Sequence, residues 1–187
     1  MGTQSPGTVR KTKCLLSGAL MRLLQRRSFR KISVGDICQE AMVSRSAFYM
    51  HFPDKYELLR FALQDVIRMQ DEQNRGASFE KRMMFWLESV QENRQMIHHM
   101  FLADLSQEMM DIFTETFEMA VREWILEMQK RGVTLTESVE LMTAFYAGGL
   151  ANVLMMWIRE NFKTSKEEIA RCQCRMMMKL MRNEGGA

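Results

Sequence analysis

A stretch near residue 45 carries side chains suited to read the base edges of a duplex and to hold its phosphates. Arg45 can donate two hydrogen bonds to guanine, Ser46 can donate or accept one, and the methyl group of Ala47 can contact the methyl group of thymine. Groups that hydrogen-bond phosphates follow shortly after, at Tyr49, His51 and Lys55. This combination predicts nucleic-acid recognition.

The other polar residues form no pattern typical of an enzyme or a metal site. We find no nucleophile, base and acid set, and no glycine-rich phosphate loop after a strand. His98 and His99 would project about 100° apart on a helix, and Cys172 and Cys174 about 200° apart, which suits neither zinc nor redox chemistry. We therefore predict no catalytic residues, no metal and no cofactor.

Two short predicted helices must position the candidate residues. The sequence predicts a helix over 35–41, a turn at 42–44 and a second helix over 45–51, with longer helices before them (9–27) and after them (54–73). A pair of short helices joined by a tight turn is the helix-turn-helix arrangement, whose second helix enters the major groove.

The rest of the chain also has helical periodicity. Further helices are predicted near 78–92, 94–103, 105–131, 136–161 and 165–182. Only 2 Pro occur among 187 residues, whereas Met alone occurs 20 times, and no strand alternation persists. We expect an all-α protein of about nine helices, with an N-terminal three-helix helix-turn-helix domain and a C-terminal helical bundle.

Charge is unevenly distributed along the chain. Residues 1–60 hold 11 Lys and Arg against 4 Asp and Glu, a net charge of +7, whereas the remainder holds 15 against 19, a net charge of −4. This indicates an anion-binding head on a mildly acidic body. Charge alone does not distinguish nucleic acid from a membrane surface as the partner.

The sequence gives no indication of membrane insertion or secretion. The longest apolar stretch, residues 144–158, is about 15 residues long and contains Asn152, so it is too short and too interrupted to cross the bilayer. The first 13 residues are polar, and the four cysteines have no disulfide spacing. We predict a cytoplasmic protein without a membrane partner.

The run from Ile32 to Leu59 reads ISVGDICQEAMVSRSAFYMHFPDKYELL and resembles the DNA-binding domain of the TetR family. The family pattern is approximately I-T-V-x-D-I-A-x-x-A-G-V-S-x-x-T-F-Y-x-H-F-x-D-K-x-E-L-L. With the preceding helix, the resemblance covers roughly residues 10–62.

The resemblance implies roles for individual residues. Arg45 and Ser46 would read bases. The DNA backbone would be contacted by Tyr49, His51, Lys55 and Ser33, together with the basic first helix (Arg10, Lys11 and Lys13). The alternative for Tyr49 and His51 is structural packing. The full set predicted to bind DNA is Arg10, Lys11, Lys13, Ser33, Gly35, Ser44, Arg45, Ser46, Ala47, Tyr49, His51 and Lys55.

The domain organisation follows from the same resemblance. We expect a flexible N-terminus (1–8), a DNA-binding domain (9–54), a connecting helix (55–74) and an effector-binding and dimerisation domain (75–187).

The sequence departs from the family pattern at several positions. Met42 replaces the turn glycine, which requires the backbone there to avoid or tolerate a positive φ. Ser33 and Ala47 replace threonines, and Cys38 replaces a small alanine in the domain core. We expect these changes to shift affinity or site preference without abolishing the motif.

Family members often release DNA when a small effector binds the C-terminal domain. We therefore expect a small apolar effector of unknown identity, in a cavity that large apolar side chains line. The candidates, for which core packing is the alternative, are Met83, Trp86, Met100, Phe101, Met109, Phe113, Phe117, Trp124, Phe145 and Tyr146.

The last two helices are candidates for a homodimer interface, because small residues recur at helical spacing. The predicted contacts are Ala144, Ala147, Gly148, Ala151, Met155, Ile169, Cys172, Met176 and Leu180. The region from Phe145 to Ile169 is also similar to one TetR subgroup, which includes a coactivator of dihydroxyacetone kinase genes.

Together these features predict a sequence-specific transcriptional regulator that acts as a homodimer on a palindromic operator in double-stranded DNA. We expect a ligand-responsive repressor. The alternative is a coactivator or protein-partner module of the same fold, which another protein controls.

Overall fold

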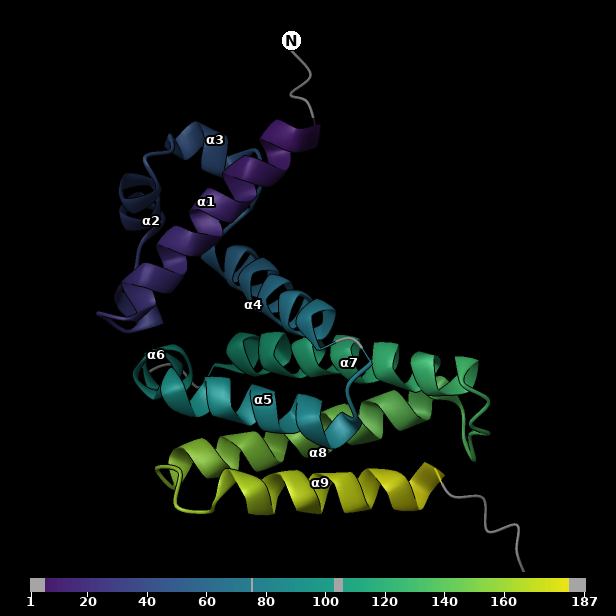
Figure 1. Cartoon of the computed structure of the whole chain (residues 1–187). Coiled ribbons are helices and arrows are strands. Elements are labelled where there is room, and N and C mark those ends of the chain that lie inside the picture. Colours follow the sequence, from purple (N-terminus) through teal and green to yellow (C-terminus); the bar gives the residue numbers. More distant parts are fainter. Residues whose placement is uncertain (1–5, 75, 103–105, 182–187) are drawn as a thin grey trace, which may run out of the picture. The chain divides into compact units, whose positions relative to one another are not determined.

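The computed structural model describes residues 6–74, 76–102 and 106–181. In this part of the chain every regular element is helical, and no strand occurs (Figure 1). The bounds are α1 Pro6–Leu24, α2 Val34–Ala41, α3 Arg45–Tyr49, α4 Lys55–Gln73, α5 Phe79–Glu92, α6 Arg94–Ile97, α7 Gln107–Lys130, α8 Val139–Arg159 and α9 Lys166–Met181, with a 3₁₀ turn η1 Phe29–Lys31 and a π-helical turn η2 His98–Leu102. The all-α prediction is confirmed.

Several helices begin or end a few residues from their predicted bounds, and two of these differences change the description of the chain. Helix α1 begins at Pro6 rather than at residue 9, so part of the predicted flexible N-terminus is helical. Proline suits the first helical position because the backbone N–H group there has no partner within the helix. The absence of this group in proline therefore costs no hydrogen bond. The helix predicted over 94–103 is a single α-helical turn that continues as the π-helical turn η2.

Side-chain caps determine where the helices of the N-terminal part begin. Ser33 accepts a hydrogen bond from the backbone of Asp36, and Ser44 accepts one from the backbone of Ala47 at 3.1 Å. Asp54 accepts from the backbone of Glu57 at 2.9 Å at the start of α4. Each cap satisfies an N–H group that the first turn of a helix leaves without a backbone partner.

The chain forms two compact units. The first contains residues up to Val66 together with Arg94–Ile112, and the second contains Ile67–Asn93 together with the residues from Phe113 onward. The division therefore falls inside α4 and inside α7. Residues 94–112, which we expected in the C-terminal domain, belong to the N-terminal unit.

Two side-chain contacts join that segment to the end of α1. His99 Nδ1 lies 2.8 Å from the carbonyl oxygen of Leu24, the last residue of α1. The amide of Gln25 lies 3.6 Å from the sulfur of Met96. The last carbonyl groups of a helix have no hydrogen-bond partner within the helix. The imidazole of His99 supplies a partner for one of them at the C-terminal end of α1.

An aromatic cluster forms the part of the N-terminal core on which α3 packs. The Phe48 ring is fully buried and lies 6.0 Å from the ring of Phe52, whose centroid is in turn 5.5 Å from that of Phe61 on α4. Leu16 and Leu20 of α1 are also fully buried. Burying these side chains compensates for the low intrinsic stability of a helix of only five residues.

In the C-terminal unit, α9 packs against α5 and α8 (Figure 1). Lys166 of α9 donates to Glu88 of α5 at 2.6 Å. The Tyr146 hydroxyl of α8 donates to the carbonyl oxygen of Met177 of α9 at 3.3 Å, and burial raises the pKa of this tyrosine to about 12. These contacts connect three helices that are far apart in the sequence.

Helix α8 is the most apolar helix of the structure. By length and composition it is the one described helix able to cross a membrane, with a mean hydropathy of 1.5 over an 18-residue window. Of that window, 56% is buried inside the protein, as in the core helix of a helical bundle.

The turn between α2 and α3 contains a residue in the left-handed region. Met42 has φ 53° and ψ 42°, and its side chain is 93% exposed. The structure thus keeps the backbone conformation that glycine adopts most easily, although a side chain is present. No packing contact offsets the strain, because the side chain extends into solvent.

We predict that Met42→Gly raises the free energy of unfolding by about 1 kcal/mol, since it removes the steric cost of a left-handed non-glycine residue. Gln39→Gly is the matched control, because Gln39 is exposed within α2 and should lose about 0.5–1 kcal/mol. Urea denaturation followed by circular dichroism measures both. A loss of stability in Met42→Gly would show that the turn does not carry this strain.

Candidate nucleic-acid interface

One side of α3 faces solvent and the other side faces the core. Arg45, Ser46 and Tyr49 are exposed, Ala47 is half-buried and Phe48 is fully buried. Tyr49 follows Arg45 by four positions and Ser46 by three, so the three exposed side chains are neighbours on one helix face. Three residues predicted to contact DNA therefore lie together on the outer face of α3.

Arg45 lies against the first turn of α2. A Cβ atom on Gly35 would be 2.5 Å from Nη2 of Arg45, so only glycine leaves this space for the guanidinium group in its present position. The predicted pair Gly35 and Arg45 is therefore brought together. The role of Gly35 that the structure shows is to give Arg45 room.

The two serines at the start of α3 contact each other. The hydroxyl oxygens of Ser44 and Ser46 are 3.0 Å apart, and Ser44 also caps the helix. Both side chains are exposed, so their remaining hydrogen-bonding capacity is accessible at the N-terminal end of α3.

Ser33, which was predicted to bind DNA, has a structural role at the start of α2. Its hydroxyl donates to Asp36 Oδ2 at 2.6 Å and accepts from the Asp36 N–H at 3.1 Å, which completes a capping box. These hydrogen bonds, with a smaller contribution from Arg27 at 3.1 Å, lower the pKa of Asp36 to about 2. Since the single hydroxyl proton is donated to a carboxylate, Ser33 cannot also donate it to a phosphate in this arrangement.

Lys55 likewise binds the protein rather than presenting its charge outward. Its ammonium group donates to the carbonyl oxygens of Phe29 (3.0 Å), Ile32 (2.9 Å) and Arg30 (3.4 Å) and lies 4.6 Å from the centre of the Phe29 ring. An ammonium group has three donors, and three carbonyls surround this one. We therefore correct the predicted phosphate contact of Lys55 to a structural role that holds η1 against α4.

The two remaining candidates after α3 differ from each other. The Tyr49 ring is 58% exposed and packs edge-on against Phe48 at 5.3 Å, so its hydroxyl can reach a ligand. His51 is half-buried, and its Nε2 atom is buried without a hydrogen-bond partner in the described part of the chain. The packing alternative therefore describes His51 better than direct phosphate contact through Nε2.

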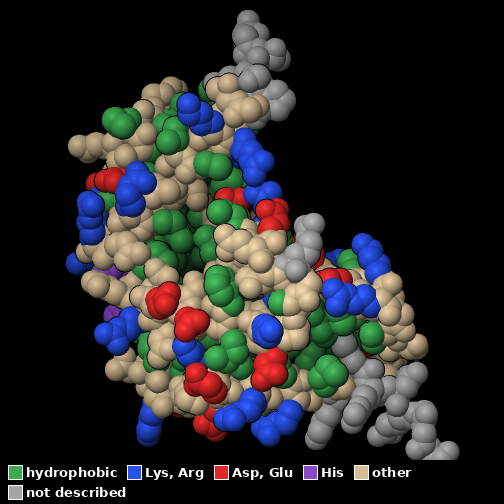
Figure 2. Space-filling model, viewed as in Figure 1, with side chains coloured by type: hydrophobic (Ala, Val, Ile, Leu, Met, Phe, Trp, Pro, Cys, Tyr) green, Lys and Arg blue, Asp and Glu red, His purple; other side chains and the backbone are tan. Residues whose placement is uncertain are grey.

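Helix α1 supplies basic groups to the surface of this unit. Arg10 and Lys11 are exposed, and Figure 2 shows basic side chains over α1. The ammonium of Lys13 lies over the rings of Phe52 and Phe61, 5.3 and 5.5 Å from their centres, so its charge stays close to the protein.

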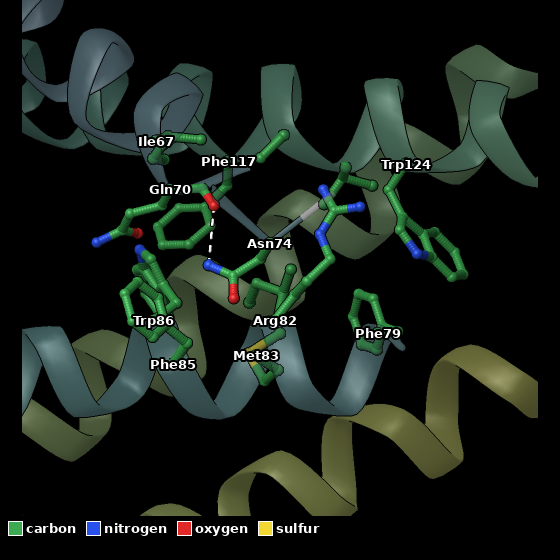
Figure 3. A pocket seen from close by; sticks show the side chains of 13 residues that line it. Ile67, Gln70, Asn74, Phe79, Arg82, Met83, Phe85, Trp86, Phe117 and Trp124 are labelled. Carbon is green, nitrogen blue, oxygen red and sulfur yellow. Dashed lines mark hydrogen bonds between the residues drawn. The ribbon is translucent and has the colours of Figure 1, made fainter. Parts of the chain in front are cut away.

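The C-terminal unit contains an apolar cavity of about 80 Å³, shown in Figure 3. Aromatic side chains line it in two pairs, with ring centres 4.7 Å apart for Phe79 and Trp124 and 4.9 Å apart for Trp86 and Phe117. Its lining residues are Ile67, Gln70, Asn74, Phe79, Arg82, Met83, Phe85, Trp86, Phe117, Ala120, Val121, Trp124 and Leu150.

The polar groups of the cavity are already bound to protein groups. Asn74 donates to the backbone oxygen of Gln70 at 2.9 Å, the Gln70 amide donates to Ser89 at 3.2 Å, and Arg82 pairs with Glu127 at 3.2 Å. The surface that lines the cavity is mostly apolar (Figure 3).

Four of the ten predicted pocket residues line this cavity, namely Met83, Trp86, Phe117 and Trp124. Phe145 and Tyr146 instead lie at a surface groove where α8 begins, and the Tyr146 hydroxyl is bound to α9. Buried core positions elsewhere are occupied by the other four, which are Met100, Phe101, Met109 and Phe113.

The predicted dimer contacts also need correction. Ala147, Ala151, Met155 and Ile169 are buried within the chain, so they cannot face a partner. Gly148 and Cys172 are half-buried, whereas Ala144 and Met176 are exposed. The side chain of Leu180 lies outside the described residues.

The exposed apolar stripe of α8 is shifted by about one residue from the predicted one. It contains Leu141, Phe145 and Met156, with Gly149 and Asn152 between them. A shift of one residue rotates a helix face by about 100°, which explains why most of the predicted stripe is buried.

Family models match most of the chain. Residues 16–61 match a model described as bacterial regulatory proteins, tetR family, and residues 79–179 match a model of the transcriptional regulator C-terminal region. The second match alone spans more than half of the 187 residues. The chain belongs to the TetR family of transcriptional regulators. As a TetR-family chain it is a DNA-binding regulator and not an enzyme.

Solved structures of TetR-family regulators share this fold. The dihydroxyacetone kinase operon activator DhaS is 19% identical, with a TM-score of 0.62 over 91% of this chain and 96% of that one. A TetR regulator from Streptococcus agalactiae is 24% identical, with a TM-score of 0.61 over 90% and 94%.

A third related structure was solved with a ligand. The TetR-family repressor FadR from Thermus thermophilus, in complex with lauroyl-CoA, is 18% identical, with a TM-score of 0.63 over 94% and 98%. A comparison with curated protein sequences finds no match.

The sequence contains a signal for part of the cavity lining that was not among the predicted residues. Phe117, Ala120, Val121 and Trp124 follow the i, i+3, i+4, i+7 spacing of one helix face. Following this stripe would have added Ala120 and Val121 to the predicted lining. No comparable pattern pointed to Gln70, Asn74 or Arg82, which come from α4, the turn after it and α5.

We predict that Lys55→Ala lowers the free energy of unfolding by about 1–3 kcal/mol, because it leaves carbonyl groups of η1 without their charged donor. Lys31→Ala is the control, since Lys31 is exposed and should change stability by less than about 0.5 kcal/mol. Denaturant titration of both variants measures the difference. An unchanged stability combined with weaker binding to every duplex would restore the phosphate role of Lys55.

Proposed function

We propose that this TetR-family chain is a sequence-specific, ligand-responsive repressor that acts in the cytoplasm as a homodimer on a palindromic operator. The observation that supports it most is the outer face of α3, where Arg45, Ser46 and Tyr49 are exposed on a helix that Phe48 fixes to the core. These side chains have the chemistry to read base edges in a major groove.

A homodimer would place two copies of α3 on the duplex. Successive major grooves on one side of DNA are about 34–36 Å apart, so a two-fold axis between the copies requires inverted half-sites. The exposed stripe of α8 supports such an association, because Phe145 is 70% exposed and Leu141 64% exposed on a helix that is otherwise mostly buried. Large apolar side chains exposed together commonly mark an interface.

The apolar cavity of the C-terminal unit is the proposed effector site. Its volume of about 80 Å³ is smaller than that of common ligand pockets, which measure roughly 300–1,000 Å³. An effector larger than a single ring must therefore move lining side chains. Such movement gives a ligand a way to favour one conformation of the regulator over another.

The proposed DNA recognition can be tested by selecting binding sites from random duplex DNA at two salt concentrations. We expect one palindrome to be enriched, and Arg45→Ala to lose about 1–3 kcal/mol of preference at one base pair of each half-site. Lys31→Ala serves as a control for the loss of a single positive charge. Enrichment of an unrepeated half-site would contradict the homodimer, and sequence-blind binding would favour the coactivator or protein-partner alternative.

The proposed effector site can be tested with intrinsic fluorescence, because Trp86 and Trp124 line the cavity whereas the third tryptophan, Trp157, is fully buried and bound to Thr164. We expect naphthalene, an apolar aromatic probe, to quench the wild-type emission. Quenching should be lost in the double variant Trp86→Phe/Trp124→Phe.

A second variant separates binding from the position of the reporters. Ala120→Leu keeps both tryptophans and places a larger side chain in the cavity, so it should weaken naphthalene binding at least tenfold. Equal affinity of Ala120→Leu and the wild type would show that the probe binds elsewhere.

A further inference from the structure

The outer face of α3 has one exposed member beyond the residues predicted to bind DNA. Met50 directly follows the last residue of α3, keeps helical backbone angles (φ −68°, ψ −21°) and donates its N–H to the carbonyl oxygen of Ser46 at 3.1 Å. Its side chain therefore lies one turn beyond Ser46 on the same face. It is 67% exposed, which makes it more exposed than Tyr49.

The polar groups beside Met50 are partly engaged within the protein. The guanidinium group of Arg45 leans toward Gly35, and the hydroxyl of Ser46 lies 3.0 Å from that of Ser44. The thioether of Met50 carries no donor and is only a weak acceptor, so it cannot hold a phosphate or pair with a base edge through strong hydrogen bonds. Its contribution to recognition must come from apolar contact.

The major groove offers one apolar group at the base edges. This group is the C5 methyl of thymine, which cytosine lacks at the same position. A flexible, polarisable methionine side chain adapts its shape to such a small target. Exposing a large apolar side chain to solvent on the outer face of α3 is unfavourable. Contact with the thymine methyl group removes this apolar surface from water and so offsets the cost.

We propose that Met50 is a specificity-determining residue that selects thymine at one position of each half-site through contact with the C5 methyl group. The proposal rests on the sequence-specific binding proposed above. Because 5-methylcytosine carries a methyl group at the same ring position, it substitutes for thymine in this contact.

Met50 and Ala47 read different positions. Ala47 is half-buried, has only a single methyl group and lies about 60° around the helix from Met50, so the longer methionine reaches a separate base pair. A thymine that depends on Met50 is therefore distinct from one that contacts Ala47.

The test replaces single thymines of the selected operator by deoxyuridine, which removes only the C5 methyl group. For the wild type, one substitution per half-site should weaken binding about fourfold, the factor expected for one methyl group removed from an apolar contact. For Met50→Ala the same deoxyuridine substitution should change the affinity less than 1.5-fold, which is about the precision of the measurement. The effects of the protein substitution and of the DNA substitution are then coupled.

Matched variants separate this contact from general effects. Met69→Ala removes another exposed methionine, which lies on α4 and is 52% exposed. Binding by this variant should still weaken about fourfold when the thymine is replaced by deoxyuridine. Met50→Leu retains an apolar side chain and should keep the preference, whereas Met50→Gln retains the length and should lose it. Thermal unfolding of each variant checks that the fold is unchanged.

Two results would overturn the inference while leaving the proposed function intact. One is an equal loss on uracil substitution in Met50→Ala and the wild type at every thymine. The other is a uniform weakening of all duplexes by Met50→Ala, which would indicate contact with the sugar and phosphate backbone. If selection enriches no sequence at all, the proposed function and the inference fail together, and the selection alone reports it.

Discussion

Burial of the Phe48 side chain is the interaction on which the reading surface depends. Helix α3 has five residues, and isolated helices shorter than about 12 residues are marginal in water. Its position is therefore determined by packing rather than by its own hydrogen bonds. With Phe48 fixed in the aromatic cluster of Phe52 and Phe61, the side chains at 45, 46 and 49 face outward.

The polar side chains around α3 divide into those that hold the structure and those that remain accessible. Lys55 and Ser33 are engaged with backbone carbonyls and with a carboxylate, and Lys13 lies over two aromatic rings. They keep η1, α2 and α1 in place. Arg45 and Tyr49 remain exposed and are the groups to which we assign recognition. A residue of the right chemical type near a recognition helix is therefore not necessarily a contact.

Much of this fold could be predicted from the sequence, because its signals are local. Serine caps, Asp54 and the apolar spacing of α1 and α4 each act within about two turns of a helix. The cavity and the dimer surface were predicted less well. They depend on which helices meet and on how each helix is rotated about its axis, and a shift of one residue in α8 exchanges a buried face for an exposed one.

The same distinction applies to the individual site residues. Exposure of Arg45 and burial of Phe48 follow from the helix-turn-helix pattern, but the three carbonyls around Lys55 come from residues that lie 23–26 positions earlier in the chain. The space above Gly35 is defined only once Arg45 of the next helix lies against it. Contacts of this kind require the three-dimensional structure.

The central claim is that DNA is bound by the outer face of α3. Hydrogen–deuterium exchange of the full-length protein with and without its selected duplex tests this directly. On DNA binding we expect reduced exchange in residues 44–51 and in the N-terminal half of α1, with no comparable change in α9. Protection confined to α8 and α9, with residues 44–51 unchanged, would contradict it.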